Sequence, residues 1–398
     1  MSFTNVSTPE KLYYDIQVSN LENTNTQPPI LQFIETRNNP FLYESDQYLM
    51  SIIRFTLDTP NLPVFIPTIQ PYQNDINLTI YSISLTYTNP ANTSQTFTQQ
   101  TFLNFVPQSN VPPLPPTTNN TPNGLQYNAD GYYNVYNYQY LIFLLNQTFS
   151  DCYNDLNTQV VNAGLTLPSA YAPVMAWNTN DSTAVINCDI LGYSTVEPIT
   201  PTFQPIKIYF NTPLAELFSS FPVFINTLSS VNGLNAQLIT DSYSQSNTIG
   251  FPPYGTYQFT AIQVFQEFST IASWTPITSI VFTSNTLPIV SNQVSQPVVF
   301  NNGVQSGNNG NNSLINQVIT DFVSSDGVYK PNLVYEPSAQ YRYIQLISNR
   351  PLTTFDLSVF WKDRFGNLQP FRLASGGTAS IKVLFTKKNT MGTGNYPK

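Results

Sequence analysis

The chain has 398 residues, of which 41% are hydrophobic and only 9% are charged, and its net charge is −8. An ordinary soluble domain has about 25% charged residues, and a chain of this length favours two to three domains unless one large fold carries an insertion. Histidine is absent. This excludes Ser-His-Asp and Cys-His catalysis, zinc sites built on imidazole and histidine-based pH switches.

The N-terminal part of the chain has the alternating pattern of β-strands. Leu49, Ile53, Phe55 and Leu57 share one parity in the run 48–57, and residues 81–87 alternate between apolar and small polar side chains. Period-two alternation predicts half-buried strands. Prolines at 60, 63, 67 and 71 separate these runs and favour loops or sheet edges.

The middle of the chain has a helical period instead. Apolar residues recur every three or four positions from Tyr138 to Val160, and Gly164 follows as a candidate C-terminal cap. A shorter helix is predicted over 212–221, with Thr212 as its N-cap and Pro213 at its first position. The proline-rich run 107–122 is the predicted entrance to this α+β segment, and its exit is predicted near 250–255.

Strand patterns return after the helical segment. Residues 301–312 are rich in Asn and Gly and predict an exposed flexible loop. Phe355, Leu357, Val359 and Trp361 alternate in one strand, a turn follows at 363–367, and Ile381, Val383 and Phe385 alternate in the last strand. Many short strands separated by turns predict an all-β-dominated sandwich or barrel.

The order of these patterns predicts an insertion within one β fold. The first and last strands must pair to complete one core, so the α+β segment is expected to interrupt it. The predicted parts are 1–108 for the first half of the β fold with an N-terminal arm, 109–252 for the inserted α+β domain, and 253–398 for the second half with a basic tail.

The basic residues gather at the C-terminal end. Residues 1–329 have four basic and nineteen acidic side chains, whereas residues 330–398 have ten basic and three acidic ones. A nucleic-acid binder needs clustered cations to displace counterions from phosphate. Lys382, Lys387, Lys388 and Lys398 are therefore candidates for contact with an acidic partner or packaged nucleic acid; otherwise they solvate the last strand and the tail.

Each of the other candidate groups has a structural interpretation as well as a functional one. Trp361, Lys362, Asp363 and Arg364 predict a charged hairpin tip or a subunit contact, or a site that grips a carboxylate or phosphate. Three interpretations of Cys152 and Cys188 stay open: buried thiols in the core, a disulfide between them, or a reactive thiol. Asp151 and Asp155 predict a solvated helix face or a carboxylate pair, and 178–181 resembles a calcium loop only loosely. We expect no catalytic residue, no cofactor and no metal.

The low charge points to assembly. Interface centres are poor in Lys, Glu and Asp and rich in aromatic residues, and this chain has 25 Tyr, 27 Phe and 3 Trp. Its longest apolar run, 140–145, is much shorter than the ~20 residues of a membrane span. The polar N-terminus has no basic region, so we expect no membrane span and no secretion through a signal peptide.

Several spaced strings carry a family resemblance: Glu267 to Ile277, Ile208 to Asn211 with Leu214 and Leu217-Phe218, Tyr335 to Arg342, Trp361 to Arg364, and Ser380 to Phe385. Together they resemble the penton (minor capsid) proteins of polinton-like viruses and virophages. The resemblance implies a single jelly-roll β-sandwich with an inserted α+β subdomain. It also implies a structural virion protein, without enzymatic activity, whose homopentamers form the capsomers at icosahedral vertices.

The same resemblance names the expected partners. They are other copies of the chain, trimers of a major capsid protein, packaged nucleic acid through the C-terminal tail, and a host receptor. We expect the protein in the virion, assembled inside the host cell. Two alternatives stay open: another capsid component, such as a major capsid subunit, whose double jelly roll requires a second strand series, and a receptor- or glycan-binding module of the virion.

Overall fold

The computed structural model describes residues 9–22, 28–71, 75–108, 113–116, 126, 128, 130–195, 203–226, 232–241, 245–246, 249–250, 256–257, 261–289, 298–301, 304–307, 317–324, 332–336 and 342–388. The chain forms two compact units. The terminal unit consists of residues 1–63 and 276–398, and the central unit of residues 64–275. The described residues are mostly β, in antiparallel sheets, which confirms the predicted all-β-dominated class.

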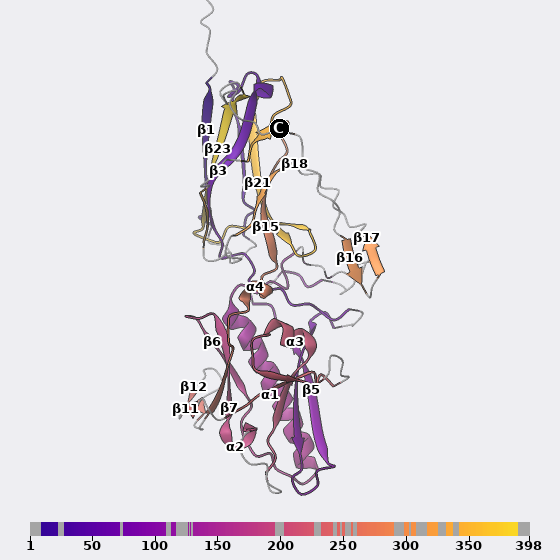
Figure 1. Ribbon diagram of the computed structural model, residues 1–398. Coiled ribbons are helices and arrows are strands. Elements are labelled where there is room, and N and C mark those ends of the chain that lie inside the picture. The colour runs from indigo at the N-terminus through magenta and orange to yellow at the C-terminus, as the bar shows by residue number, and fades with distance from the viewer. Residues whose placement is uncertain are drawn as a thin grey trace, which may run out of the picture. The chain divides into compact units, whose positions relative to one another are not determined.

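Two antiparallel sheets form the terminal unit (Figure 1). The first sheet has the order β1-β23-β3-β19, with β20 also paired to β3; its strands are Lys11–Ser19, Thr378–Lys387, Tyr48–Asp58, Asn332–Tyr335 and Ile344–Gln345. The second sheet has the order β18-β15-β21-β2, with β22 also paired to β21; its strands are Gln317–Phe322, Ile277–Ser284, Thr354–Asp363, Gln32–Thr36 and Leu368–Pro370. A 3-10 turn, Ser45–Gln47, precedes β3.

Aromatic side chains fill the space between these two sheets. Phe55 of β3 lies 5.1 Å, between ring centroids, from Phe282 of β15 and 4.9 Å from Phe322 of β18. Phe355 of β21 lies 5.9 Å from Phe385 of β23. Such edge-to-face and tilted pairs stabilise the structure beyond the area that they bury. The inward-facing rings are the alternating residues that the sequence pattern predicts for 355–361 and 381–385.

A β-bulge changes the predicted parity of β3. Lys382 pairs with Arg54 and Val383 with Ile52, so Ile53 has no partner on β23. The buried apolar residues are therefore Tyr48, Met50 and Ile52 before the bulge, and Phe55 and Leu57 after it. The prediction that Leu49 and Ile53 share the buried parity of Phe55 was wrong, because an extra residue shifts the alternation by one position.

The central unit has one long helix packed between two sheets (Figure 1). The third sheet has the order β5-β4-β8-β10-β9, with strands Thr96–Asn104, Leu78–Thr88, Lys207–Phe210, Ala236–Leu238 and Val223–Ile225. The fourth sheet has the order β11-β14-β7-β6, with strands Gln245–Ser246, Ala261–Phe265, Thr183–Asp189 and Val174–Asn178. The helices are α1 Tyr138–Asn162, α2 Ile190–Tyr193, α3 Thr212–Leu217 and α4 Ile271–Trp274.

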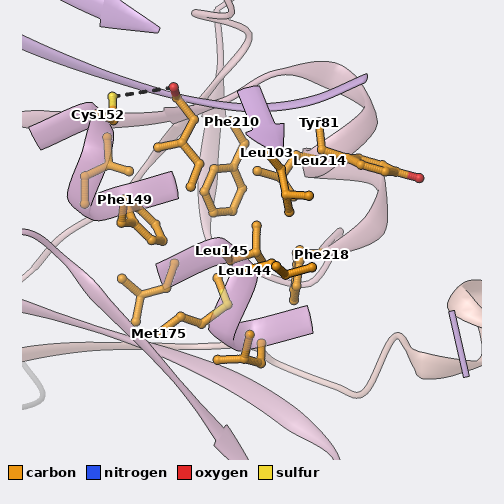
Figure 2. Close-up of a cluster of buried hydrophobic side chains, with 14 of the residues drawn as sticks. Tyr81, Leu103, Leu144, Leu145, Phe149, Cys152, Met175, Phe210, Leu214 and Phe218 are labelled. Atoms are coloured by element: carbon orange, nitrogen blue, oxygen red, sulfur yellow. Dashed lines mark hydrogen bonds between the residues drawn. The ribbon is translucent and has the colours of Figure 1, made fainter. Parts of the chain in front are cut away.

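Helix α1 supplies the middle of the central unit's core. Leu144, Leu145 and Phe149 pack with Phe210 of β8 and Phe218, which follows α3 (Figure 2). The Asn146 side chain bonds both backbone groups of Met175, which fastens α1 to β6. The helix that the apolar spacing predicts is therefore confirmed, and its two apolar sides meet two different sheets.

Helix α3 differs from its prediction at both ends. Its N-cap is Asn211, whose side-chain oxygen accepts a hydrogen bond from the Leu214 amide at 3.3 Å. The helix ends at Leu217 and does not continue to residue 221. Asn211 also bonds the β4 backbone through its amide nitrogen, to the carbonyl of Ile80 at 2.7 Å. Asn211 thus caps α3 with its side-chain oxygen and bonds β4 with its side-chain nitrogen. Thr212, the predicted cap, is already the first residue of the helix and has no second polar group for the bond to β4.

Strand β4 is buried on both faces, although its alternation predicts only one. Ser82 and Ser84 are fully buried behind the core face. The Gln100 amide donates to the Ser82 hydroxyl at 2.8 Å, and the Ser84 hydroxyl donates to the carbonyl of Asn232 at 2.7 Å. Gly233, at φ +68°, packs here so closely that a Cβ would lie 2.6 Å from the Gln100 amide. A second layer of chain covers the polar face, which alternation cannot reveal.

The central unit is larger than the predicted insert 109–252. It begins at Val64 and ends at Thr275. Strand β4 pairs with β5 on one side and with β8 on the other, in one sheet. Residues 261–274 contribute Ile262, Val264 and Trp274 to the core of this unit. The predicted entrance 107–122 and exit 250–255 lie largely outside the described residues. Both are internal to this unit and are not its boundaries.

Two small hairpins complete the described structure. They are β12 Ile249–Gly250 with β13 Thr256–Tyr257, and β16 Val298–Asn301 with β17 Val304–Gly307. The second hairpin overlaps the predicted flexible loop 301–312, and pairs Asn301 with Val304. Residues 302–303 and 308–312 of that loop lie outside the described residues.

Candidate interaction surfaces

The outer face of the first sheet has a row of three charges across three strands. Asp15 on β1 pairs in register with Lys382 on β23, which pairs with Arg54 on β3. The Lys382 ammonium lies 3.4 Å from Asp15 and 5.5 Å from the Tyr13 ring, and the Arg54 guanidinium lies 3.8 Å from Asp15. Lys382, a candidate genome contact, is therefore partly neutralised within its own sheet. Exposed pairs of this kind are screened by salt and contribute little to stability.

The other predicted cations of the tail divide at the end of β23. Lys387 is the last residue of β23, and its amide donates to the carbonyl of Glu10 at 2.8 Å. The Lys388 ammonium donates to the backbone carbonyl of Asp46. Lys398 lies outside the described residues. Lys387 and Lys388 thus lie at the end of β23, whereas Lys382 lies in the middle of that strand.

The predicted group 361–364 splits between interior and surface. Trp361 is 4% exposed on the inner face of β21, and Asp363 is 3% exposed. Asp363 accepts hydrogen bonds from the amides of Phe365 and Asn367, both at 2.9 Å, and so holds the turn that contains Gly366 at φ +81°. Trp361 and Asp363 have structural roles, whereas Lys362 is partly exposed and Arg364 is exposed.

Lys362 belongs to a cluster that the sequence pattern did not reveal. Its ammonium lies 4.0 Å from the Asp321 carboxylate on β18, and Arg342 lies 3.5 Å from the same carboxylate. The Arg342 guanidinium also lies 5.7 Å from the centre of the Phe322 ring. Two cations beside one carboxylate give this part of the second sheet an excess positive charge. Pairing of β18 with β15 and of β15 with β21 brings Asp321 and Lys362 together.

A second unforeseen cluster joins the edges of the two sheets. The Tyr14 hydroxyl of β1 donates to the Glu35 carboxylate of β2, which also accepts from Arg37 at 2.8 Å. Burial, the bond to Glu35 and the charge of Glu35 raise the pKa of Tyr14 to about 12. The bonds from Tyr14 and then Arg37 hold the pKa of Glu35 below its usual range. This cluster ties β1 to β2 across the lateral side of the terminal unit.

The remaining chemical candidates have structural surroundings in the described residues. Cys152 and Cys188 are free and fully buried, and Cys152 points toward the carbonyl of Ile83 (Figure 2). Burial raises the pKa of Cys152 to about 12, so the reactive-thiol and disulfide alternatives lose their support. Asp151 and Asp155 are exposed on α1, and Asp181 bonds the Asn178 side chain at 2.8 Å in a hairpin turn.

Metal-binding clusters and membrane-spanning helices are absent from the described residues. These residues contain no group of three or more Cys, Asp or Glu side chains that could hold a metal ion. They also contain no helix that is long and apolar enough to cross a membrane.

Exposed apolar side chains mark the open edges of the sheets. On β9, the edge of the third sheet, Phe224 is 59% exposed and Ile225 is 62% exposed. On β2, the edge of the second sheet, Ile34 is 69% exposed. Exposed apolar residues on unpaired edges are typical of surfaces that another chain covers. The described surface therefore offers edges for assembly.

Comparison with known proteins gives a consistent set of relatives. The family described as Sputnik minor capsid protein V18/19 matches residues 12–387. The uncharacterized protein V18 of Sputnik virophage is 29% identical over 153 residues, 38% of this chain and 87% of that protein. The structural protein V19 of the same virophage is 27% identical over 196 residues, 46% of this chain and 83% of that protein.

Two solved structures have a similar fold. A chain in the cryo-EM structure of the Sputnik virophage has a TM-score of 0.74 at 23% identity, over 96% of this chain and 99% of that chain. The crystal structure of the mavirus penton protein has a TM-score of 0.57 at 15% identity, over 95% of this chain and 99% of that chain.

Proposed function

The chain belongs to the Sputnik minor capsid protein V18/19 family, and we propose that five copies of it form the penton capsomer at the icosahedral vertices of a virion. As a member of this family it is a structural protein of the virion. The similarity to a penton protein extends over almost the whole chain, which supports the more specific role.

The observation that carries the proposal is the strand order of the terminal unit. Taken in chain order, its eight main strands pair first with last (β1–β23), second with seventh (β2–β21), third with sixth (β3–β19) and fourth with fifth (β15–β18). A long hairpin of four such pairs, rolled into two facing sheets, is a jelly roll. We infer a single jelly roll whose third and fourth strands are separated by the central unit.

The alternatives have less support. A double jelly roll, as in the predicted major capsid subunit, requires a second set of eight strands in this pattern. The central unit instead has a helix between two sheets of a different strand order. A glycan-binding module often uses tryptophan faces, but Trp274 and Trp361 are buried and Trp177 stacks on Tyr138 at 5.0 Å. Tyr13 and Tyr43 are exposed, so this alternative stays open.

The low charge of the chain suits this role. A capsomer is held by large interfaces, and uncharged interfaces resist changes in salt because few ion pairs are screened. In the same proposal the neighbours are trimers of a major capsid protein, assembly takes place inside the host cell, and the chain has no enzymatic activity. Contact of Lys382, Lys387, Lys388 and Lys398 with packaged nucleic acid stays a prediction, as does a host receptor.

Native mass tests the proposal. Light scattering of the purified chain should give about 223 kDa, five times 44.7 kDa, with five-fold rosettes in negative stain. The mass should be the same at 0.1 M and 1 M NaCl. A trimer in both salts would contradict the penton role and favour a major capsid subunit or a spike. If the chain is monomeric alone, it is mixed with the major capsid protein and the assembled particles are examined in negative stain. Absence of the chain from the vertices of these particles would also contradict the proposal.

A further inference from the structure

We propose that Arg342 and Lys362, on the outer face of the second sheet, bind the phosphate backbone of nucleic acid. Each cation lies near a different oxygen of the Asp321 carboxylate, and all three residues belong to the terminal unit. Among the alternatives for Lys362, this selects the phosphate site and adds Arg342 to it. The inference needs only the place of the chain in a virion, which encloses nucleic acid, and does not depend on the pentamer.

Asp321 leaves both cations with hydrogen-bond donors to spare. Its carboxylate lies 3.5 Å from Arg342 and 4.0 Å from Lys362, whereas a close charge-assisted hydrogen bond measures about 2.7–2.9 Å. One Nη atom of Arg342 donates to the backbone carbonyl of Asp321 at 2.7 Å, which fixes the guanidinium in place. A guanidinium has five N–H donors, so most of them stay available for a phosphate oxygen.

The first sheet has a matching group, and the comparison shows which face suits a polyanion. There Asp15 lies 3.4 Å from Lys382 and 3.8 Å from Arg54. The Asp15 side chain is 63% exposed, more than Arg54 at 42% or Lys382 at 31%. On the second sheet Arg342 is 63% exposed and Asp321 only 45%. An approaching phosphate therefore meets a carboxylate first on the first sheet and a guanidinium first on the second.

The charge of the two units also limits where a polyanion can bind. The central unit has one basic residue, Lys207, against ten acidic ones, a net charge of −9, whereas the terminal unit has a net charge of +1. Salt at about 0.15 M screens exposed charges beyond about 8 Å, so a bound phosphate responds mainly to nearby side chains. Arg364, exposed two residues after Lys362, adds a third cation at this end of β21.

Nucleic acid fits this face better than an acidic protein segment does. Asp321 already gives both cations a carboxylate, so one further carboxylate gains little. Double-stranded DNA instead has one charge per ~1.7 Å of its axis, and each phosphate contact releases condensed counterions. Arg and Lys are the side chains that contact phosphate most, without regard to base sequence. We expect weak binding that depends strongly on salt and not on sequence.

Salt-dependent binding of the full chain to a fluorescent DNA duplex tests the inference. Arg342→Gln and Lys362→Gln should each weaken binding several-fold, and each should lower the slope of log affinity against log salt by about 1. Asp321→Asn should instead tighten binding several-fold, because it removes the carboxylate that opposes the phosphate. A purely structural role of these residues would not give opposite signs for the cations and the acid.

The matched controls are Arg54→Gln and Lys382→Gln on the first sheet. Both residues flank a carboxylate in the same way, and their substitution should leave the affinity and the salt slope unchanged. Circular dichroism and melting temperature report whether each variant is folded. Equal losses from the two sheets would overturn the inference, because they would show that only the overall charge matters.

Three further results would overturn the inference. They are folded Arg342→Gln and Lys362→Gln variants that bind DNA like the wild type, no binding of the wild type to duplex or single-stranded DNA in low salt, and displacement of the DNA by polyglutamate at equal charge. The last result would identify the ligand as a protein carboxylate. Light scattering of the same preparations reports the oligomeric state, so the loss of this site leaves the proposed capsomer standing, and the reverse also holds.

Discussion

One buried carboxylate, Asp356 on β21, holds the turn that follows β15. It is 6% exposed and accepts hydrogen bonds from the amides of Asn285 and Thr286, both at 2.9 Å, and from the hydroxyls of Ser284 and Thr286. Burial alone raises the pKa of Asp356, but these bonds outweigh it and hold the pKa below its ordinary value. The negative charge is therefore part of the fold of the terminal unit.

Asp356→Asn should destabilise the terminal unit by about 2 kcal/mol at pH 7, because an amide accepts these bonds less well and adds a donor among donors. A lowered folded pKa gives stability that is present above the unfolded value, about 3.9, and is lost as the pH falls through the folded pKa. The stabilities of the wild type and the variant should therefore converge below about pH 4. Calorimetry from pH 3 to 7 measures this difference.

The matched control for that experiment is Asp151→Asn. Asp151 is exposed on α1, and its substitution should change the free energy of unfolding by less than about 0.5 kcal/mol. A constant gap between Asp356→Asn and the wild type across this pH range would contradict the role of the charge. It would point to packing alone.

At the scale of elements, helix α1 is the one whose ends follow local rules most closely. Asn137 caps its N-terminus through a bond from the Tyr140 amide at 2.8 Å. At the other end Gly164 has φ +73°, its amide donates to Val161, and the Leu165 amide donates to Val160. This is the Schellman arrangement, in which a left-handed residue satisfies the last carbonyls of the helix.

Gly164→Ala should lower the stability of the central unit by about 1 kcal/mol. A Cβ at this position would meet nothing within 4 Å, so the cost comes from the left-handed backbone and not from a clash. Gly164→Asn should cost less, because Asn tolerates this conformation. Thermal unfolding of the three proteins gives the comparison, and equal losses for Ala and Asn would show that the backbone strain is not the cause.

Strands obey local rules less completely than helix α1 does. The bulge at Ile53 exchanges the two faces of β3 halfway along its length. The cover over Ser82 and Ser84 buries the face of β4 that looks solvent-exposed from its composition. Both effects depend on the chain that lies beside or above the strand. The period-two alternation of the strand's own residues gives no information about that neighbouring chain.

At the scale of the whole molecule, folding rearranges the charge. Along the chain, acidic and basic residues separate at about residue 330. In the folded protein the terminal unit has thirteen basic and twelve acidic side chains, a net of +1, while the central unit has a net of −9. The basic C-terminal segment shares a unit with acids from the N-terminal segment. The Asp15–Lys382 pair is the direct example.

The boundaries of the central unit can be tested with fragments. Residues 64–275 expressed alone should fold and melt cooperatively, because every residue of its core cluster lies between Val64 and Trp274. The fragment 109–252, which the sequence patterns predict as the insert, should not fold. It lacks β4, β5 and β14, and with them Ile83, Leu85 and Ile262 of that core.

Calorimetry and amide exchange separate these outcomes. A folded 109–252 would contradict the wider boundaries. An unfolded 64–275 would mean that its core needs the rest of the chain.

The amino-acid sequence by itself determined the β-dominated class, the long helix with its C-terminal glycine and the absence of histidine chemistry. These depend on composition and on short periodicities, which act within a few residues. The boundaries of the central unit, the bulge in β3, the pairing of Tyr14 with Glu35 and the neutralisation of Lys382 were decided only by the tertiary structure. Each depends on segments tens or hundreds of residues apart, such as Asp15 and Lys382, whose contact no local pattern encodes.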